Sequence, residues 1–466
     1  MIIKGDISVT SSLQHLIQKY DTSGPRYTSY PPAPVFTSQF GAGNFLEEVR
    51  KAESHPRNAE VSLYVHVPFC DTLCYFCGCT TIITRSRERM HDYVGYLKKE
   101  IDLLFPLLHR SRKIVQMHWG GGTPTYLSPA EIVDLGNHLQ RSFVFSDDPE
   151  ISVELDPRDL TIHHMRALRD TGFNRVSIGV QDFDAKVQRA VNRNQSEFIT
   201  RQAIDWSRAL GFQSINLDLI YGLPLQTLES FSETLEKVIA ISPERIAVYN
   251  FAYVPWMKKH HSIIHPEDLP APEVKIAILL HTIERFTEAG YVYIGMDHFA
   301  KPGDELAIAQ QRRTLQRNFQ GYSTHGGADL YAFGMSAISH FAGTYAQNIK
   351  TLLEYQTAIE RGRFATHAGY VMTSDDRLRK AVIMRLMCHM VLDKNEIEKE
   401  FHVEFDSYFA DSLKKLDPLV EDGLVNASSR EIRITSSGRL FLRNIAMCFD
   451  AYHATQQHRP LYSKTV

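Results

Sequence analysis

The sequence Cys70-Asp-Thr-Leu-Cys74-Tyr-Phe-Cys77-Gly-Cys79 places four of the six cysteines of the chain within ten residues. Its gaps of three and then two residues differ from the paired Cys-x-x-Cys knuckles of a structural zinc site. Three clustered thiolates can hold three irons of a [4Fe-4S] cluster, and the fourth iron is then open to a small molecule. Zinc and a disulfide pair are the alternative interpretations, and the sequence around the motif argues against both.

The composition is that of a large globular protein. The chain has 466 residues, of which 43% are hydrophobic, and a formal net charge of −3. This length allows one large domain and a smaller one, and the near-neutral charge gives no reason to expect a nucleic-acid partner. Residues 1–20 lack the pattern of a signal peptide, and no apolar run is long enough to span a bilayer. With the cysteines clustered as for a metal centre in a reducing compartment, we predict a cytoplasmic protein.

From about residue 44 the sequence alternates between two kinds of segment. Short runs rich in β-branched or aromatic residues predict strands at Val61–Val67, Ile114–Trp119, Ile151–Leu155, Arg175–Val180, Ile215–Ile220 and Arg245–Tyr249. Helix-like segments lie between them at His91–Leu108, Pro129–Ser142, Ile162–Thr171, Phe198–Leu210 and Leu228–Ile241. Strand followed by helix, six times, predicts a parallel sheet that right-handed crossovers curl into a full or partial α/β barrel.

Residues suited to ligand binding follow the predicted strands. Ligands of such a fold lie at the carboxyl ends of the strands, and the cysteine loop begins three residues after the first strand. The other strand ends carry Gly120-Gly-Gly-Thr123, Glu154, Gln181, Asp218 and Ala252. Each of these has a simple explanation as a turn, a cap or a satisfied core polar group. Their common placement at one rim predicts a cofactor site.

The two ends of the chain differ from the alternating region. Residues 1 to about 43 show little periodic structure, and Ser23–Pro32 is too rich in Pro and Gly for a helix. Arg26, Tyr27 and Tyr30 in this stretch suit either a surface linker or a segment that covers a pocket. The sequence from about residue 378 resembles a winged helix, with two amphipathic helices, two short strand-like runs and an apolar helix. Winged helices often bind DNA, but the mixed charge of these segments favours a role in packing or as a lid instead.

One segment between these regions allows two interpretations. Tyr291–Ala300 is expected to form a further strand that leads to a loop. Within it, Asp297 and His298 can be a proton-handling pair or a buried hydrogen-bonded pair. We favour the buried pair.

The cysteine spacing resembles that of the radical S-adenosylmethionine (SAM) superfamily, and the chain as a whole resembles the oxygen-independent coproporphyrinogen III oxidases. The resemblance covers nearly the whole chain. It is carried by Gly24–Pro31, Tyr64–Cys70 with the cysteines that follow, His118–Tyr126, Gly172–Arg175, Gly179–Phe183, Asp218–Pro224, Gly295–Ala300, Asn318–Tyr322 and Asn444–Asp450.

This resemblance implies a fold and a set of site residues. The fold is a partial, three-quarter (β/α)6 TIM-like barrel with extra strands over residues 44–377, preceded by a substrate-covering segment at 1–43 and followed by a small, mainly helical, winged-helix-like domain at 378–466. By motif position the cluster ligands are Cys70, Cys74 and Cys77. The residues implied for two SAM molecules are Tyr64, Phe76, Gly121, Gly122, Thr123, Glu154, Gln181, Arg193, Asp218, Ala252 and Ile338. The residues implied in catalysis are Cys79, Tyr64, His66, Glu154, Phe319 and Gln320.

The resemblance also implies a reaction. The family removes two carboxylates from propionate side chains of coproporphyrinogen III and leaves vinyl groups, using one [4Fe-4S] cluster and SAM. A flavodoxin- or ferredoxin-like electron donor and a monomeric enzyme are expected with it. Two alternatives on the same scaffold are a haem-binding chaperone and a radical SAM methyltransferase. The presence of Cys79 and of Gly24–Pro31 favours the oxidase over the chaperone.

Overall fold

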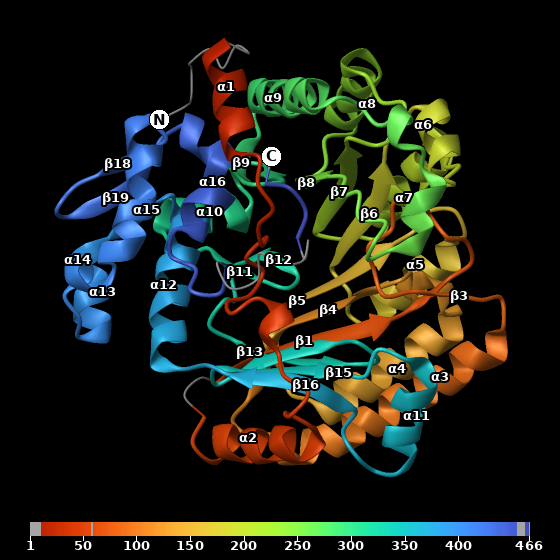
Figure 1. Ribbon diagram of the computed structural model, residues 1–466. Coiled ribbons are helices and arrows are strands. Elements are labelled where there is room, and N and C mark those ends of the chain that lie inside the picture. The colour runs from red at the N-terminus through yellow and green to blue at the C-terminus, as the bar shows by residue number, and fades with distance from the viewer. Residues whose placement is uncertain (1–10, 57–58, 454–461, 466) are drawn as a thin grey trace.

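The computed structural model describes residues 11–56, 59–453 and 462–465, and its centre is a curved sheet (Figure 1). The sheet has 12 strands in the order β16-β15-β14-β13-β1-β4-β5-β6-β7-β8-β10-β9. Six of them are parallel to their neighbours and follow one another along the chain. These are β1 (Glu60–Val67), β4 (Lys113–Gly121), β5 (Phe145–Leu155), β6 (Arg175–Gln181), β7 (Ser214–Tyr221) and β8 (Arg245–Asn250).

Helices connect these parallel strands and cover the outside of the sheet (Figure 1). They are α3 (Arg87–Leu104), α4 (Pro129–Ser142), α5 (Ile162–Asp170), α6 (Ala185–Ala190), α7 (Glu197–Ala209) and α8 (Leu228–Ile241), with α9 (Pro272–Glu288) after β8. The starts of α4 and α8 agree with the sequence prediction because each has a clear cap. The Ser128 hydroxyl accepts from the Glu131 N–H, and Thr227 Oγ1 accepts from the Ser230 N–H. The predicted α/β fold is therefore confirmed.

Extra strands extend both edges and leave the barrel open. On one side β13 (Asp329–Phe333) pairs parallel with β1, and β14 (Ile338–Phe341), β15 (Thr344–Asn348) and β16 (Thr366–Val371) follow antiparallel. On the other side lie β10 (His298–Ala300) and β9 (Val292–Gly295). Within the described ranges the two edge strands, β16 and β9, do not pair with each other. The barrel is partial, as predicted.

Three local predictions differ from the structure. Strand β5 begins at Phe145 rather than Ile151, because Phe145 pairs with Ile114 and Glu150 with Gln116 of β4, with a register shift between the two pairs. Helix α1 (Ser11–Tyr20) lies in a region where no regular structure was expected, and α2 (Ala42–Ser54) follows before the first strand. The segment 291–300 is an antiparallel pair of short strands, β9 and β10, rather than one strand and a loop.

The remaining elements build a second layer beside the barrel. After α10 (Glu305–Arg312), a two-stranded hairpin, β11 (Gln316–Asn318) and β12 (Gly321–Ser323), precedes β13, and α11 (Leu352–Glu360) precedes β16. The C-terminal part consists of α12 (Ser374–His389), β17 (Val391–Asp393), α13 (Lys394–Phe401), α14 (Phe405–Tyr408), α15 (Ala410–Glu421), β18 (Val425–Ala427), β19 (Glu431–Ile434) and α16 (Leu442–Met447). Its helices and its three-stranded sheet, β17-β19-β18, have the winged-helix arrangement.

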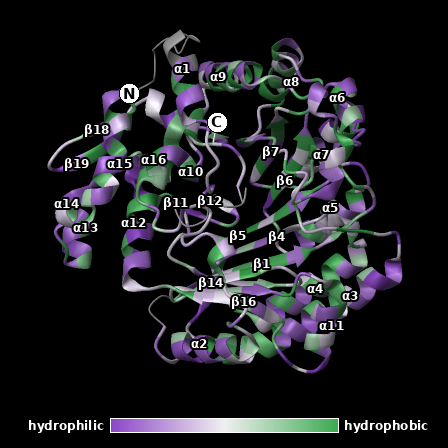
Figure 2. Ribbon diagram, viewed as in Figure 1, coloured by the Kyte–Doolittle hydropathy of each residue, from purple (hydrophilic) through white to green (hydrophobic). Residues whose placement is uncertain are grey.

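Two hydrophobic clusters hold these layers together. The larger one joins the sheet to its outer helices, with Val65, Met117 and Leu135 among its fully buried members. The second joins the C-terminal helices to β9, α9 and the N-terminal segment. Figure 2 shows hydrophilic and hydrophobic residues on the same outer helices, as expected for helices that cover a core with one face. No helix of the described residues combines the length and the apolar content needed to cross a membrane.

Candidate active site

The cysteine loop begins at the carboxyl end of β1. Cys70 ends the short strand β2 (Phe69–Cys70), which pairs with β3 (Ile82–Ile83), and its Sγ lies 3.5 Å from the hydroxyl of Thr123 at the end of β4. Cys74 is buried, and none of the six cysteines is in a disulfide. A hydrogen bond from Cys79, opposed in part by burial, lowers the pKa of Cys77 to about 6. This end of the barrel therefore gathers four thiols, one of them readily ionised.

Two arginines point at the sulfur of Cys74. Arg158 Nη2 and Arg193 Nη1 each lie 3.6 Å from Cys74 Sγ. Asp156 holds both guanidinium groups, at 2.6 Å from Arg158 and 3.1 Å from Arg193. Although burial opposes it, the two arginine charges lower the pKa of Asp156 to about 2. Positive N–H groups aimed at a cysteine sulfur suit a thiolate bound to iron.

The donor set fits a [4Fe-4S] cluster better than a single ion. In the described part of the chain, no group of three or more His, Cys, Asp or Glu side chains is placed to hold one metal ion. A zinc site needs such convergence on one centre, whereas a cubane cluster receives each thiolate at a different corner. The three cysteines on one loop, together with the arginines at Cys74, fit the cluster.

The loop after β8 fastens the cysteine loop from the other side. Lys258 Nζ donates to the carbonyl of Cys79 at 2.9 Å, and His260 Nε2 donates to the carbonyl of Cys77 at 2.8 Å. These bonds hold the backbone of the last two cysteines. No sequence signal pointed to Lys258 or His260, because the loop lies almost 180 residues further along the chain. Arg158 and Asp156 were also missed, although Asp156 directly follows β5.

Glu154 and the glycine run form the next part of the site. Glu154 Oε2 accepts from the Gly121 N–H at 3.0 Å, and Oε1 lies 3.3 Å from His118 Nε2. A Cβ on Gly120 would come within 2.9 Å of the Glu154 carboxylate, so a side chain at this position would displace that carboxylate. Burial raises the pKa of Glu154, but His118 and the Gly121 N–H outweigh it and hold the pKa below its usual value. Glu154 is therefore an anion that faces the inside of the barrel.

Tyr64 and His66 stand beside Glu154 on β1. Tyr64 OH lies 3.0 Å from His66 Nδ1, and His66 Nε2 lies 3.0 Å from the carbonyl of Thr80. Because a carbonyl only accepts, His66 Nε2 carries the proton and Nδ1 accepts from the Tyr64 hydroxyl. Burial lowers the pKa of His66. A neutral His66 thus orients Tyr64 and also ties β1 to the end of the cysteine loop.

The strand ends of β6 and β7 supply the polar residues opposite. Gln181 ends β6 with a positive φ of 68°, and Arg193 Nη2 donates to the carbonyl of Gly179 at 2.8 Å. Asp218 accepts from Ser177 Oγ at 2.7 Å, and burial together with the charge of Glu154 raises its pKa to about 6. These residues share one rim with Glu154, as the sequence predicts.

Two groups of predicted site residues lie around this rim. Phe76 and Ala252 line a mainly apolar hollow of about 250 Å³, together with Ile220 and Tyr249. Ile338 begins β14 two residues after Ser336, whose hydroxyl is 3.5 Å from His66 Nε2.

Phe319 and Gln320 come from the β11–β12 hairpin. The Phe319 ring packs edge-on against Tyr345 at 6.0 Å between centroids. The hairpin thus holds Phe319 against β15, whereas the cysteine loop follows β1.

The stretch 24–31 is a structural element rather than a linker. Tyr27 and Tyr30 are 1% and 0% exposed. The Tyr27 hydroxyl donates to Asp450 at 2.9 Å, and the Tyr30 hydroxyl accepts from the Ala451 N–H at 3.0 Å. The stretch thus packs on the C-terminal layer.

The C-terminal part of the chain and the barrel both hold this stretch. Arg443 donates to the carbonyl of Pro25 at 3.1 Å, and the Gly24 N–H donates to the carbonyl of Ser463 at 3.2 Å. On the barrel side Arg26 forms a salt bridge with Asp297. The predicted Asp297–His298 pair is therefore wrong, because the Asp297 carboxylate is taken by Arg26.

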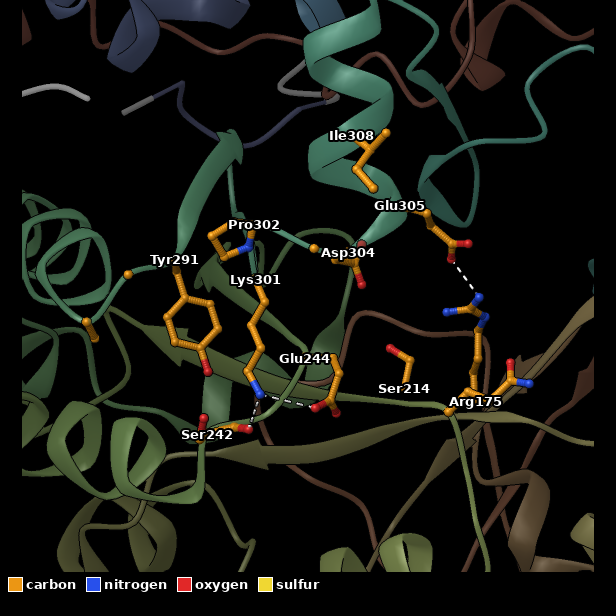
Figure 3. Close-up of a pocket in the computed structure, with 14 residues that line it drawn as sticks. Arg175, Ser214, Ser242, Glu244, Tyr291, Lys301, Pro302, Asp304, Glu305 and Ile308 are labelled. Atoms are coloured by element: carbon orange, nitrogen blue, oxygen red, sulfur yellow. Dashed lines mark hydrogen bonds and ion pairs between the residues drawn. The ribbon is translucent and has the colours of Figure 1, made fainter. Parts of the chain in front are cut away.

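A second hollow, of about 670 Å³, lies at the opposite end of the barrel (Figure 3). It is lined by residues from the amino ends of β6, β7 and β8. Its charges are already paired, with Arg175 bound to Glu305 at 2.7 Å and Lys301 to Glu244 at 3.2 Å. The cysteines are at the other end, so this hollow is separate from the candidate site.

Comparisons with known proteins agree with this geometry. Residues 64–238 match the model of the Radical SAM superfamily, and residues 372–441 match that of the HemN C-terminal domain. The chain is 47% identical to the oxygen-independent coproporphyrinogen III oxidase of Escherichia coli K12 over 97% of this chain and 98% of the relative. It is 47% identical to that of Pseudomonas aeruginosa over 94% and 95%. The crystal structure of coproporphyrinogen III oxidase (HemN) from E. coli, described as a radical SAM enzyme, superposes with a TM-score of 0.88 at 46% identity, covering 94% of this chain and 98% of that one.

Proposed function

This chain belongs to the oxygen-independent coproporphyrinogen III oxidase family of the radical SAM superfamily, and from that premise we propose that it converts coproporphyrinogen III to protoporphyrinogen IX without oxygen. It is an oxidoreductase whose cofactors are a [4Fe-4S] cluster and SAM. The observation that carries the proposal is identity of 47% over nearly the full length of both chains. The site geometry supports it, because the cysteines, the glycine run and Glu154 meet at one end of the barrel.

The chemistry explains why these cofactors are needed. A propionate has no electron sink beside the carbon that is oxidised, so a polar decarboxylation is unfavourable. When bound, the cluster and SAM supply a 5′-deoxyadenosyl radical that removes one hydrogen atom from the substrate. Loss of CO2 and one further electron then leaves the vinyl group. Each of the two propionates thus gives up one hydrogen atom, one CO2 and one electron, and a separate acceptor must take the electron.

We assign roles to the residues of the chain on this basis. Cys70, Cys74 and Cys77 would hold the cluster, and Cys79 would stay free of iron beside Cys77. Tyr64, Gly121 and Glu154 would bind one SAM. A second SAM would use Phe76, Gly122, Thr123, Gln181, Arg193, Asp218, Ala252 and Ile338. Phe319 and Gln320 would face the porphyrinogen.

The N-terminal segment would complete the site. We propose that residues 1–43 cover the substrate, that 44–377 form the catalytic unit and that 378–466 form the third unit. The burial of Tyr27 and the bond between Arg26 and the barrel support a cover that is held in place. Such a cover excludes water and competing hydrogen donors from the radical. Residues 1–10 lie outside the described residues.

Partners and location complete the proposal. We propose a monomeric, cytoplasmic enzyme that receives electrons from a flavodoxin- or ferredoxin-like protein. Six free cysteines support a reducing compartment.

The test is an anaerobic assay of the reconstituted protein with SAM, a low-potential reductant, an electron acceptor and coproporphyrinogen III. The expected product has lost two CO2 and four hydrogens in total, and SAM is required. A product that has gained a methyl group would favour a methyltransferase. Retention of haem without any conversion would favour a chaperone.

A further inference from the structure

Three buried polar atoms near the N-terminal stretch have no hydrogen-bond partner among the described residues. They are Arg317 Nη1, His298 Nδ1 and Gln320 Nε2. Arg317 is only 7% exposed. A buried donor without an acceptor is costly, and buried polar groups are normally satisfied. Two of the three atoms are obligate donors, and the third can donate in one tautomer. The missing partner is therefore an acceptor.

These three residues lie together at the β11–β12 hairpin. The Arg317 guanidinium stands 4.7 Å over the ring of Tyr322, and the His298 ring packs edge-on against the same ring at 5.3 Å. A side chain on Gly321, next to Gln320, would come within 3.6 Å of His298 Nε2. Arg317 and His298 thus both pack on the Tyr322 ring, and the turn that carries Gln320 adjoins them at this place.

The charge at this place is positive. Arg317 Nε donates to the carbonyl of Arg26 at 3.4 Å, so the two arginines are neighbours. Asp297 is already paired with Arg26. His298 adds no charge of its own, since burial lowers its pKa to about 3 and leaves it neutral. An anion is therefore the acceptor that this place fits.

The place adjoins the predicted cofactor site. The Tyr249 ring packs edge-on against His298 at 5.8 Å, and the Arg26 guanidinium stands 5.8 Å over the same Tyr249 ring. Tyr249 also lines the 250 Å³ hollow with Phe76 and Ala252. A molecule bound at Arg317 would therefore extend towards the part of the site that handles SAM.

We propose that Arg317, together with His298 and Gln320, binds the carboxylate of a propionate side chain of the substrate. This inference rests on the proposed function, because it takes the substrate class from it. A guanidinium offers two parallel N–H groups to a carboxylate, which fixes direction as well as position. Arg26 then closes the same carboxylate region from the N-terminal stretch. SAM also carries a carboxylate, so the experiment must separate the two ligands.

The experiment compares reconstituted holoenzyme with its Arg317→Gln variant under anaerobic conditions. The probe is coproporphyrin III, the stable oxidised form of the substrate, and binding is followed by its fluorescence. The variant is expected to bind this porphyrin about tenfold or more weakly, since a hydrogen bond to a charged group is lost. Its binding should also depend less on salt. SAM affinity and the substrate-free formation of 5′-deoxyadenosine should match those of the parent.

Controls make each outcome decisive. Arg312→Gln removes a charge from an exposed position at the end of α10 and should leave porphyrin binding unchanged. Arg317→Lys keeps the charge without the two-pronged donor and should bind with intermediate affinity, and it decides the question if Arg317→Gln does not fold.

Equal porphyrin affinity in the parent and the variants, or a loss confined to SAM binding, overturns the inference. A parent enzyme that does not convert coproporphyrinogen III would overturn the proposed function instead.

Discussion

Arg158→Gln is expected to lower the reduction potential of the cluster without removing the cluster. The three cysteines proposed as ligands are untouched, so iron and sulfide content should equal that of the parent. What is lost is one N–H donor with a positive charge, 3.6 Å from Cys74 Sγ. Such donors stabilise the reduced, more negative form of an iron–sulfur cluster. Arg193 still contacts the same sulfur, so the effect should be partial.

The size of the effect follows from this geometry. A contact of 3.6 Å to sulfur is longer than a usual N–H···O bond, and we take about 1 kcal/mol for it. For a one-electron couple, 1.4 kcal/mol corresponds to about 59 mV, so the expected shift is about 40 mV to more negative potential. Loss of the Asp156 salt bridge contributes less to the potential, since Arg193 keeps that carboxylate paired.

The assay is a redox titration followed by the electron paramagnetic resonance signal of the reduced cluster. Arg158→Lys is the matched control, because it keeps a positive charge on a side chain of similar length, and its shift should be smaller. Arg189→Gln, an exposed arginine of α6, reports the effect of removing a distant charge. An unchanged potential in Arg158→Gln with a full cluster would refute the reasoning. A variant that cannot hold the cluster would show that Arg158 supports the loop rather than the sulfur.

Three further predictions concern other parts of the site. Cys74→Ser should lose the cluster absorbance and all activity together, whereas Cys79→Ser should keep full iron content and lose decarboxylation. Iron analysis and a product assay check both variants. A Cys74→Ser protein with a full cluster would contradict the ligand assignment. Glu154→Gln should weaken SAM binding about tenfold or more at unchanged iron content, because a buried anion and its bonds are altered; equilibrium dialysis with SAM measures this, and normal affinity would count against the role. Tyr27→Phe should lower the free energy of unfolding by about 1.5–3 kcal/mol, because Asp450 loses a charged hydrogen bond. Urea denaturation measures this change, and an unchanged midpoint would mean that the hydrogen bond does not stabilise the fold.

Much of the barrel could be predicted from the sequence because of the apolar pattern of its strands. Runs such as 61–67 and 215–220 place Val, Leu or Ile at every second position, with polar residues such as His66 and Asp218 between them, a period-2 pattern that predicts strands. The first part of β5 could not be found this way, since Ser146–Glu150 is polar and includes a proline. Its ends are fixed by an irregular pairing with β4, in which Phe145 opposes Ile114 and Glu150 opposes Gln116, and no local pattern reveals this.

Some residues of the candidate site could likewise be predicted from the sequence, and others could not. Glu154, Gln181 and Asp218 could be predicted because strand ends of a parallel sheet meet at one rim. Arg317 and Lys258 could not, because the carbonyls to which they donate, those of Arg26 and Cys79, lie 291 and 179 residues away in the sequence. The Asp297 prediction failed for the same reason, since a local pair was expected and a distant arginine took the carboxylate.

The stretch 24–31 has a consequence for the order in which the enzyme is made. It leaves the ribosome early, yet its partners include Arg443, Asp450 and Ser463, which are translated more than 400 residues later. Domains generally fold as they emerge, so the cysteine loop and the rim can form while this stretch still has nothing to pack against. The cysteine loop can therefore take its place before this stretch does. The stretch reaches its buried position only after α16 and the residues around Asp450 have been made, so its packing reports that the C-terminal layer is in place.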